Sequence, residues 1–473
     1  MEDRIIFKEV HRVVIVGGGS SAWLAAAYFS NQSNIYVTVI DKEQAQPIGV
    51  GEATLLGFPD FMSSCGFDEK EWFPAIDGTY KSGILFPGWG REGIDVWHPF
   101  AIDPNNIGIL SEWLSVQDGP LSNYLPLYKE SKNNLVNRSA LKFYAVNIDC
   151  IKLIAYIQQK IKDKINFINS GVRLVEKTGI NVDYVQCESG EKITGDIFID
   201  CTGLNQILIG SSCNSSLEDK LPCNTAVAGH VEYKDFKKEC SPYVTCTPMP
   251  EGWLWNIPVR SRIGSGMVFN RSITDVETAK QRFSDYWDSR VSLENLKVLS
   301  WDPYVNREPW QGNVAAIGLS SGFLEPLEST GLAIACKGIS VLYDRIQQNY
   351  FDDTDVGLFN QIMEATYREA VDFVAMHYSR KIFPSDFWSH AYNLPTPDVQ
   401  KYLEKMHNSD YKMIYEGKGH IFGLINWHCW LLQLSELPKP LKIESEILNN
   451  YITLLNKKCL ESIEHDWLLK QGH

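Results

Sequence analysis

Apolar runs and small polar turns alternate near the N-terminus in an order typical of a nucleotide-binding fold. Arg12–Val16 is a β-branched run that predicts a buried parallel strand. A glycine-rich turn follows directly at 17–22, and apolar residues at helical spacing continue to Phe29. Residues 35–40 predict the next strand, which ends in an acid, Asp41.

This order of strand, glycine turn, helix, strand and acid predicts a dinucleotide site. Gly17 makes the tight turn, Gly19 lets a pyrophosphate approach the backbone, and Ala22 allows the helix to pack closely on the strand. Asp41 is placed to accept hydrogen bonds from the ribose hydroxyls of an adenine dinucleotide. The alternative left open is a glycine-rich turn that binds nothing.

Two apolar strands return much later in the chain. Residues 196–203 end in Asp-Cys-Thr-Gly, and residues 314–318 end at glycine. Such late strands fit a FAD-binding, Rossmann-like fold of the monooxygenase type, whose dinucleotide domain is split by a substrate domain. They do not fit a compact two-domain dehydrogenase. We therefore predict an α/β fold with α+β insertions, and FAD as its cofactor.

Strand patterns of another kind lie between these segments. Alternation predicts paired strands at 172–184 and 191–200, with turns at Gly179 and Gly190. Residues 227–233, 251–258 and 265–269 predict an inserted antiparallel sheet. Trp253 and Trp255 lie two apart on one face of a strand. They line a tunnel or fill a core, and the spacing does not decide between the two.

Beyond residue 332 the pattern is mostly helical. Helices are predicted at 332–350, 355–382, 396–406 and 442–465, with a proline-containing linker at 437–441. We expect a discontinuous FAD-binding module over 1–340, with its inserted sheet at about 220–305, and a helical substrate-binding region over 341–473.

A polar loop between the strand at 314–318 and the helix from 332 carries the strongest candidate chemistry. Glu328 precedes a Ser-Thr-Gly turn at the helix start, where free backbone N–H groups and the helix dipole favour an anion. The alternative is a Ser/Thr helix cap beside solvated glutamates.

Lys81 and His98 are further candidates, each with a structural alternative. Lys81 lies between Tyr80 and an apolar run, which predicts a desolvated amine of altered proton affinity. A surface lysine whose stem lies along apolar residues would look the same. His98 is followed by Phe100 in an aromatic-rich insert, and a hydrogen-bonded structural histidine is the alternative to a catalytic one.

Composition narrows the class of protein. The 473 residues are 44% hydrophobic and 22% charged, as in ordinary globular proteins. A net charge of −14 argues against nucleic acid as a partner. The eleven cysteines show neither a disulfide framework nor a metal site. Without a signal peptide or an apolar run of about 20 residues, we expect a cytoplasmic protein with no membrane partner.

Several segments together resemble the motif set of the flavin-dependent halogenases of the tryptophan-halogenase type. They are GGGSSAW at 17–23, GVGEAT at 49–54, Lys81, WLWNIP at 253–258 and FLEPLESTG at 323–331. The W-x-W-x-I-P element is the most specific and is intact. The resemblance covers roughly residues 12–340 and weakens beyond, where only His377-Tyr378, Asp386-Phe387-Trp388 and Asn426-Trp427 match.

The resemblance implies an enzyme that receives FADH2 from a separate flavin reductase and uses O2 and a halide to form hypohalous acid. Chloride, bromide and iodide are all open as the halide. The acid reaches an electron-rich arene through a tunnel. Lys81 and Glu328 are the implied catalytic pair: Lys81 hydrogen-bonds the hypohalous acid or becomes a haloamine, and Glu328 polarises the oxidant or accepts the arene proton.

The resemblance also implies binding residues. Thr330 and Gly331 would hold the halide, and Trp253, Trp255 and Ser329 would line the tunnel. His98 and Phe100 would flank the arene. A homo-oligomer is the implied assembly. The implied flavin contacts are Gly17, Gly19, Ser20, Ala22, Asp41, Ala53, Val172, Leu319 and Leu332.

Three departures from the family pattern qualify these expectations. Ala22 replaces a third glycine, and Asn147 stands where a histidine is expected. The C-terminal aromatic and acidic set that clamps free tryptophan is not recognisable. We therefore expect an indole, a phenol or another electron-rich arene as substrate. The rival functions are a flavin monooxygenase that hydroxylates an aromatic substrate, and a non-catalytic flavin-binding protein.

Overall fold

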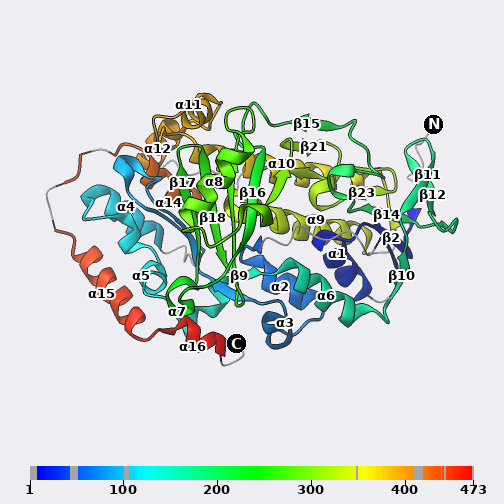
Figure 1. Ribbon diagram of the computed structural model, residues 1–473, viewed down its shortest axis with the longest axis horizontal. Helices are drawn as coiled ribbons and strands as arrows, with labels where there is room; N and C mark the ends of the chain where they lie inside the picture. The colour runs from blue at the N-terminus through cyan, green and yellow to red at the C-terminus, as the bar shows by residue number, and fades with distance from the viewer. Residues whose placement is uncertain are drawn as a thin grey trace.

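The computed structural model describes residues 8–32, 34–42, 52–100, 106–347, 350–408, 419–437, 439–441 and 444–470. Residues 49–51 of the GVGEAT segment lie outside these ranges. The ribbon shows a parallel sheet near the N-terminal end, a larger antiparallel sheet beside it, and helices of the C-terminal half along both (Figure 1). In the described ranges, no helix combines the length and the apolar character that crossing a membrane requires.

The parallel sheet confirms the predicted Rossmann-like core. Its order is β10 (Ile165–Asn169), β3 (Tyr36–Asp41), β2 (Arg12–Val16), β14 (Ile197–Asp200), β23 (Val314–Ala316) and β22 (Trp310–Gln311). All neighbours pair in parallel except the edge strand β22. In β2, Val13 and Ile15 face the main core while Val14 and Val16 face a second one. Burial on both faces explains the unbroken apolar run.

The late strands therefore return as the sequence predicts. β14 pairs with β2 on one side and with β23 on the other, although more than 180 residues separate Arg12 from Asp196. The hairpin of β11 (Val172–Thr178) and β12 (Asn181–Cys187) turns at Gly179, where φ is +63°, and covers the second core with β13 (Lys192–Ile193). Both predicted segments, 172–184 and 191–200, contain strands, but β12 continues to Cys187 and the second segment holds two strands, β13 and β14, in different sheets.

The antiparallel sheet is larger than the prediction. Its order is β20 (Lys297–Ser300), β16 (Thr225–Val231), β19 (Ile263–Phe269), β18 (Gly252–Pro258), β17 (Val244–Met249), β6 (Gly83–Phe86) and β7 (Val96–Pro99). The predicted bounds of about 220–305 omit β6 and β7. These two strands join because β6 pairs in parallel with β17, a long-range contact that leaves no local pattern.

A small three-stranded sheet positions the predicted lysine. Strand β9 (Ala145–Ile148) lies between β4 (Glu52–Ala53) and β5 (Thr79–Lys81). Asn147 faces Ala53 on one side and Thr79 on the other, and Lys81 pairs with Ala145. The residue after β4, Thr54, is thereby brought next to Lys81.

The helices that precede α9 in the chain lie around these sheets. They are α1 (Ser20–Ser30), α2 (Gly57–Ser64), α3 (Glu69–Ala75), α4 (Asn106–Val116), α5 (Tyr128–Lys132), α6 (Cys150–Ile161), α7 (Phe236–Glu239) and α8 (Val276–Tyr286). Short strand pairs join β1 (Lys8–Glu9) to β25 (Tyr350–Phe351), and β15 (Asn214–Ser216) to β21 (Tyr304–Asn306) and β24 (Gly322–Phe323).

The C-terminal half is helical, with several corrections to the predicted bounds. The helices are α9 (Thr330–Ile346), α10 (Asp353–His377), α11 (Asp386–Asn393), α12 (Val399–His407), α14 (Leu424–Leu434), α15 (Glu446–Leu460) and α16 (His465–Lys470). The predicted helix at 442–465 is wrong beyond Leu460, because β26 (Ile463–Glu464) is extended and pairs with β8 (Leu135–Val136). Helices α11 and α14 have no counterpart in the prediction. α14 is apolar on nearly every side and so lacks the periodicity of a surface helix.

Candidate active site

Lys81 lies at the centre of the candidate site and is completely buried. Its Nζ donates to the Thr54 carbonyl oxygen at 3.0 Å and to Ser329 Oγ at 2.9 Å. The same nitrogen is 4.7 Å from the centre of the Phe100 ring. Burial lowers the pKa of this amine to about 7, against an opposing effect of the nearby Glu328 carboxylate. The alternative of a surface lysine is therefore wrong.

Glu328 stands in an unusual turn in front of α9. Its side chain is buried, and both Glu328 and Ser329 have left-handed backbone conformations, with φ of +66° and +59°. Such conformations are costly for residues other than glycine and persist where surrounding contacts hold them. The alternative of solvated glutamates is thus wrong as well.

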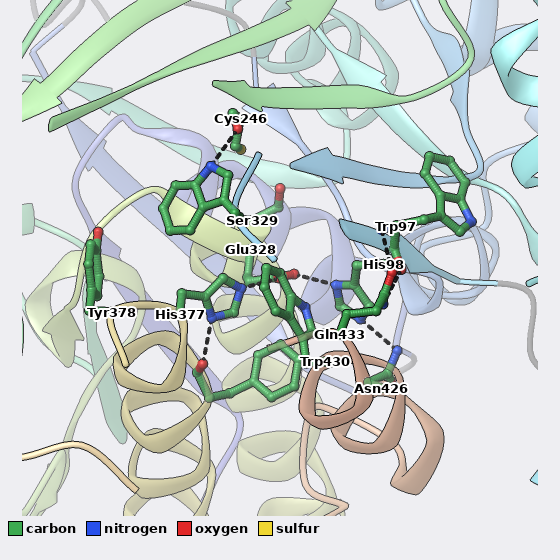
Figure 2. A network of polar contacts seen from close by, with 12 residues as sticks. Trp97, His98, Cys246, Glu328, Ser329, His377, Tyr378, Asn426, Trp430 and Gln433 are labelled. Carbon is green, nitrogen blue, oxygen red and sulfur yellow. Dashed lines mark hydrogen bonds and ion pairs between the residues drawn. The ribbon is translucent and has the colours of Figure 1, made fainter. Parts of the chain in front are cut away.

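Three side chains from three elements hold the Glu328 carboxylate. His98 Nδ1, on β7, is 2.6 Å from Oε2, and His377 Nε2, at the end of α10, is 2.7 Å from Oε1. Trp430 Nε1, on α14, donates to Oε1 at 3.1 Å. The two histidines approach the carboxylate from opposite sides, as Figure 2 shows.

These partners decide the charge of Glu328. Burial on its own raises the pKa of a carboxyl group, but His98 and His377 outweigh that effect and lower the pKa of Glu328 to about 2. The group is therefore a carboxylate at any physiological pH. An ionised carboxylate offers about four acceptor positions, and three of them are used here.

His98 and Phe100 both contact other residues of the candidate site. The second ring nitrogen of His98 accepts from Asn426 Nδ2 at 2.8 Å, so both of its nitrogens have protein partners. Phe100 lies against the Lys81 amine. Neither observation tests contact with an arene, but His98 is joined directly to the catalytic candidate Glu328.

The start of α9 keeps the features of an anion site. Ser329 caps the helix without a side-chain bond to its backbone, and the first turn holds no acidic residue. Thr330 is buried, and a Cβ added at Gly331 would meet no atom within 4 Å outside its own helix. Space beside free N–H groups suits a small anion, so Thr330 and Gly331 stay the predicted halide residues.

The predicted flavin contacts were tested for fit at the glycine turn. Gly17 has φ of +128°, and a Cβ there would lie 2.2 Å from the Cys201 carbonyl oxygen, so only glycine is tolerated. A Cβ on Gly19 would instead point into open space. Helix α1 begins at Ser20 with no side-chain cap and no acidic residue in its first turn. This turn fits a pyrophosphate.

The other predicted flavin contacts lie on several elements. Asp41 ends β3, with its carboxylate against Gly18, and Ala22 is buried in α1. Ala53 ends β4, Val172 begins β11, Leu319 lies in a 3₁₀ turn at Gly318–Ser320, and Leu332 lies in the first turn of α9. A cavity of about 420 Å³ opens between α2 and α9 and is lined by Thr54 and Ala333, the neighbours of Ala53 and Leu332.

The two tryptophans of the W-x-W-x-I-P element differ in their partners. Trp253 is fully buried, and its Nε1 donates to the Tyr378 hydroxyl at 3.0 Å. Trp255 packs beside it, with ring centres 6.3 Å apart, but its buried Nε1 has no partner among the described residues. Trp253 thus fills a core, while Trp255 keeps a free donor that suits a tunnel wall or a ligand contact.

Sequence analysis missed four residues that shape this site. His377, Trp430 and Asn426 hold Glu328 and His98, and Tyr378 donates to the second glutamate of the loop, Glu325, at 2.5 Å. His377-Tyr378 and Asn426-Trp427 match the halogenase pattern, but that match carried no role for them. Asn147 is buried too, and its Nδ2 donates to Thr79 Oγ1 at 3.1 Å while its Oδ1 has no partner in the described chain.

Comparison with known proteins agrees with this arrangement. The sequence profile described as tryptophan halogenase matches residues 12–446. The tryptophan 6-halogenase ThaL of Streptomyces albogriseolus is 28% identical over 408 residues, which cover 78% of this chain and 76% of ThaL. The solved structure of Tar14, a tryptophan C-6 flavin-dependent halogenase from taromycin biosynthesis, has a TM-score of 0.85 at 23% identity, over 98% of this chain and 99% of Tar14. Xcc4156, a flavin-dependent halogenase from Xanthomonas campestris, has a TM-score of 0.86 at 22% identity, with coverage of 98% and 99%.

Proposed function

Because the chain belongs to the tryptophan halogenase family of flavin-dependent halogenases, we propose that it uses FADH2, O2 and a halide to halogenate an electron-rich arene at Lys81 and Glu328. One observation carries this proposal. The completely buried Lys81 amine is bonded to the partly buried Ser329, which is 248 residues away in sequence and directly follows the buried Glu328.

The cofactor would be held by the residues whose geometry fits it. The turn at Gly17 and Gly19, with Ser20 and Ala22, would receive the pyrophosphate, and Asp41 the ribose. Ala53, Val172, Leu319 and Leu332 would complete the contacts. When bound, reduced FAD supplies the electrons with which O2 is activated. Thr330 and Gly331 would hold the halide at the start of α9.

Lys81 would act on the hypohalous acid. With a pKa of about 7, its amine is available near neutral pH both as an ammonium donor and as a neutral nucleophile. The first form would hydrogen-bond hypohalous acid, and the second would take up the halogen as a haloamine. Either role requires an amine shielded from bulk water, and the complete burial of Lys81 supplies that shielding.

Glu328 would accept the proton that leaves the arene after halogen transfer. A base must be ionised to do so, and the low pKa of Glu328 keeps it ionised. Its one unused acceptor position is the place for that proton. Ser329, bonded to Lys81 and next to Glu328, would link the two groups.

An arene without a charged amino-acid head group suits this site best. A free amino acid needs partners for its ammonium and its carboxylate. Lys81, Glu328, His98 and His377 each already have protein partners. The nearby Glu325, whose pKa burial raises to about 8, is neutral near pH 7 and offers no charge to an ammonium. Indoles and phenols are therefore the substrate class we propose. A separate flavin reductase would be the transient partner, and the assembly a homo-oligomer.

A mass-spectrometric assay tests this function. The protein, FAD, NADH and a separate flavin reductase are incubated with tryptophan, indoles or phenols, in chloride, bromide or iodide separately, beside Lys81→Ala. We expect a halide-dependent mass shift that is absent in Lys81→Ala, with indole turned over at least as well as tryptophan. A shift of one oxygen that is indifferent to halide and to Lys81 would establish a hydroxylase instead. Strict dependence on tryptophan would refute the proposed substrate class.

A further inference from the structure

Two consecutive residues at the end of α10 each hold one glutamate of the loop at 325–328. His377 bonds Glu328 at 2.7 Å, and Tyr378 bonds Glu325 at 2.5 Å. All four side chains are buried. The end of this one helix thereby fixes both carboxyl groups of the loop, and Figure 2 shows the one that belongs to Glu328.

The two carboxyl groups nevertheless differ in charge. Burial raises the pKa of Glu325 to about 8, and its Oε2 has no partner in the described chain. Glu325 is therefore a neutral acid near pH 7. Glu328, only three residues on and as deeply buried, receives three donors and is a carboxylate. Donors to the carboxyl group, and not burial, separate the two.

The hydrogen-bond partners of His377 specify its protonation state. Its Nδ1 is 2.8 Å from the Phe373 carbonyl oxygen, and its Nε2 faces the Glu328 carboxylate. Both partners are acceptors, so both ring nitrogens must carry a proton. His98 differs, because its Nε2 accepts from Asn426 and only its Nδ1 donates. Of the two histidines at Glu328, His377 thus faces acceptors at both ring nitrogens, whereas His98 has an amide nitrogen at one of them.

The ring of His377 is also fixed in place. It lies against Trp430, with ring centres 3.8 Å apart, and against Phe86 at 5.4 Å. A cation over an indole face is stabilised by the ring quadrupole. The Glu328 turn opposite it is strained, because both Glu328 and Ser329 have a left-handed backbone.

We propose that His377, as an imidazolium, is the positioning residue that keeps Glu328 ionised and in its strained turn. That this positioning by His377 matters for halogenation rests on the proposed function, in which Glu328 is the base. The other ionisable groups near the pair are Lys81 on β5, His98 on β7 and Glu325 in the same loop. Among these groups in the described chain, His377 is the one that has acceptors at both of its ring nitrogens, the Phe373 carbonyl oxygen and the Glu328 carboxylate.

Two variants separate the charge of His377 from its shape. His377→Phe keeps an aromatic ring against Trp430 but removes both donors. His377→Gln restores one N–H for Glu328 without the charge. His390→Gln on α11, away from this network, is the control for loss of a histidine. We expect the halogenation rate of His377→Phe, relative to wild type, to fall by about 10²-fold at about pH 6 and to recover as pH rises towards about 9. His377→Gln should recover part of the loss.

A spectroscopic measurement tests the charge without any activity. In ¹⁵N-histidine NMR of wild-type protein, one of the ten histidines should have both ring nitrogens protonated at about pH 7, and this signal should vanish in His377→Gln but persist in His390→Gln. A neutral His377 ring at pH 7, or a loss in His377→Phe that is the same at every pH, would overturn the proposal. If wild type halogenates none of the substrates, the proposed function is refuted instead. The NMR measurement would still test the protonation of the His377 ring, because it does not depend on activity.

Discussion

Lys81 shows how burial changes the chemistry of a single residue. An exposed lysine is an ammonium at neutral pH and has no use as a nucleophile. Here the amine is enclosed by Thr54, Ser329 and the Phe100 ring, and desolvation brings its pKa to about 7. The same burial that prepares the group for chemistry makes the folded protein less stable, because the unfolded chain exposes a normal lysine.

Replacing Lys81 by methionine should therefore reduce activity and increase stability. Methionine keeps the apolar stem and removes the amine, so halogenation should fall by about 10²–10⁴-fold. The unfolded state binds more protons than the folded state between pH 7 and the normal lysine pKa, so wild-type stability rises with pH over that window. The melting temperature of Lys81→Met should thus exceed that of wild type at pH 7, and the difference should shrink by about pH 9.

Thermal denaturation of both proteins at several pH values checks this expectation. Activity is measured on the same preparations, so that a loss of fold is not mistaken for a loss of chemistry. A variant less stable than wild type at pH 7 would mean that the bonds to Thr54 and Ser329 outweigh the desolvation of the amine.

Helix α10 is the element on which the site depends most. Its last residue, His377, and the residue that caps it, Tyr378, hold the two glutamates of the loop at 325–328, and Glu369, two turns earlier, holds another segment. The buried Glu369 carboxylate accepts from the backbone N–H groups of Gly419, His420 and Ile421 at 2.6–3.0 Å. His420 and Ile421 line the cavity between α2 and α9, so α10 joins the wall of that cavity to the active-site loop.

Glu369→Gln should release the segment at 419–421. The amide keeps one acceptor and turns a donor towards backbone donors, so the free energy of unfolding should fall by about 2–3 kcal/mol. Hydrogen exchange at residues 419–421 should speed up by more than the global loss of stability explains. The matched control is Glu364→Gln on the exposed side of the same helix, whose ion pair with Arg368 is open to solvent and worth little. Equal exchange at 419–421 in both variants would contradict this account.

At the scale of the whole molecule, the C-terminal helix closes back onto the strand that carries Lys81. His465, the first residue of α16, accepts from the Tyr80 N–H at 3.4 Å, across 385 residues, and its Nδ1 bonds the Cys240 carbonyl oxygen at 2.9 Å. One donor and one acceptor require a neutral ring. Burial accordingly lowers the pKa of His465 to about 4.

This contact predicts how the stability of the whole protein depends on pH. Between about pH 4 and pH 6.5 the unfolded state binds a proton at His465 that the folded state refuses, so stability falls as the pH is lowered through this window. One such group contributes at most about 1.4 kcal/mol per pH unit. The free energy of unfolding is measured in urea at about pH 5 and pH 7 for wild type and His465→Asn. Its change per pH unit should be smaller in the variant, by an amount that corresponds to at most one proton. An unchanged slope would show that His465 is protonated in the folded state.

The local pattern of the sequence was sufficient where the relevant contacts are near neighbours. Strand β2, the glycine turn, α1 and β3 follow one another directly, and each leaves its own periodicity. The hairpin turns at Gly179 and Gly190 were predictable for the same reason. The last helices were predicted less well, since α14 is apolar all round and β26 is held extended by pairing with β8, over 300 residues earlier.

Sequence by itself thus determined the Rossmann-like core and the family, and it singled out Lys81 and Glu328 as candidate catalytic residues. Only the tertiary structure decided their ionisation. A pKa depends on burial and on the donors within about 3 Å, and for Glu328 these come from β7, α10 and α14. No pattern near residue 328 records those partners, because the fold brings them together from distant parts of the chain.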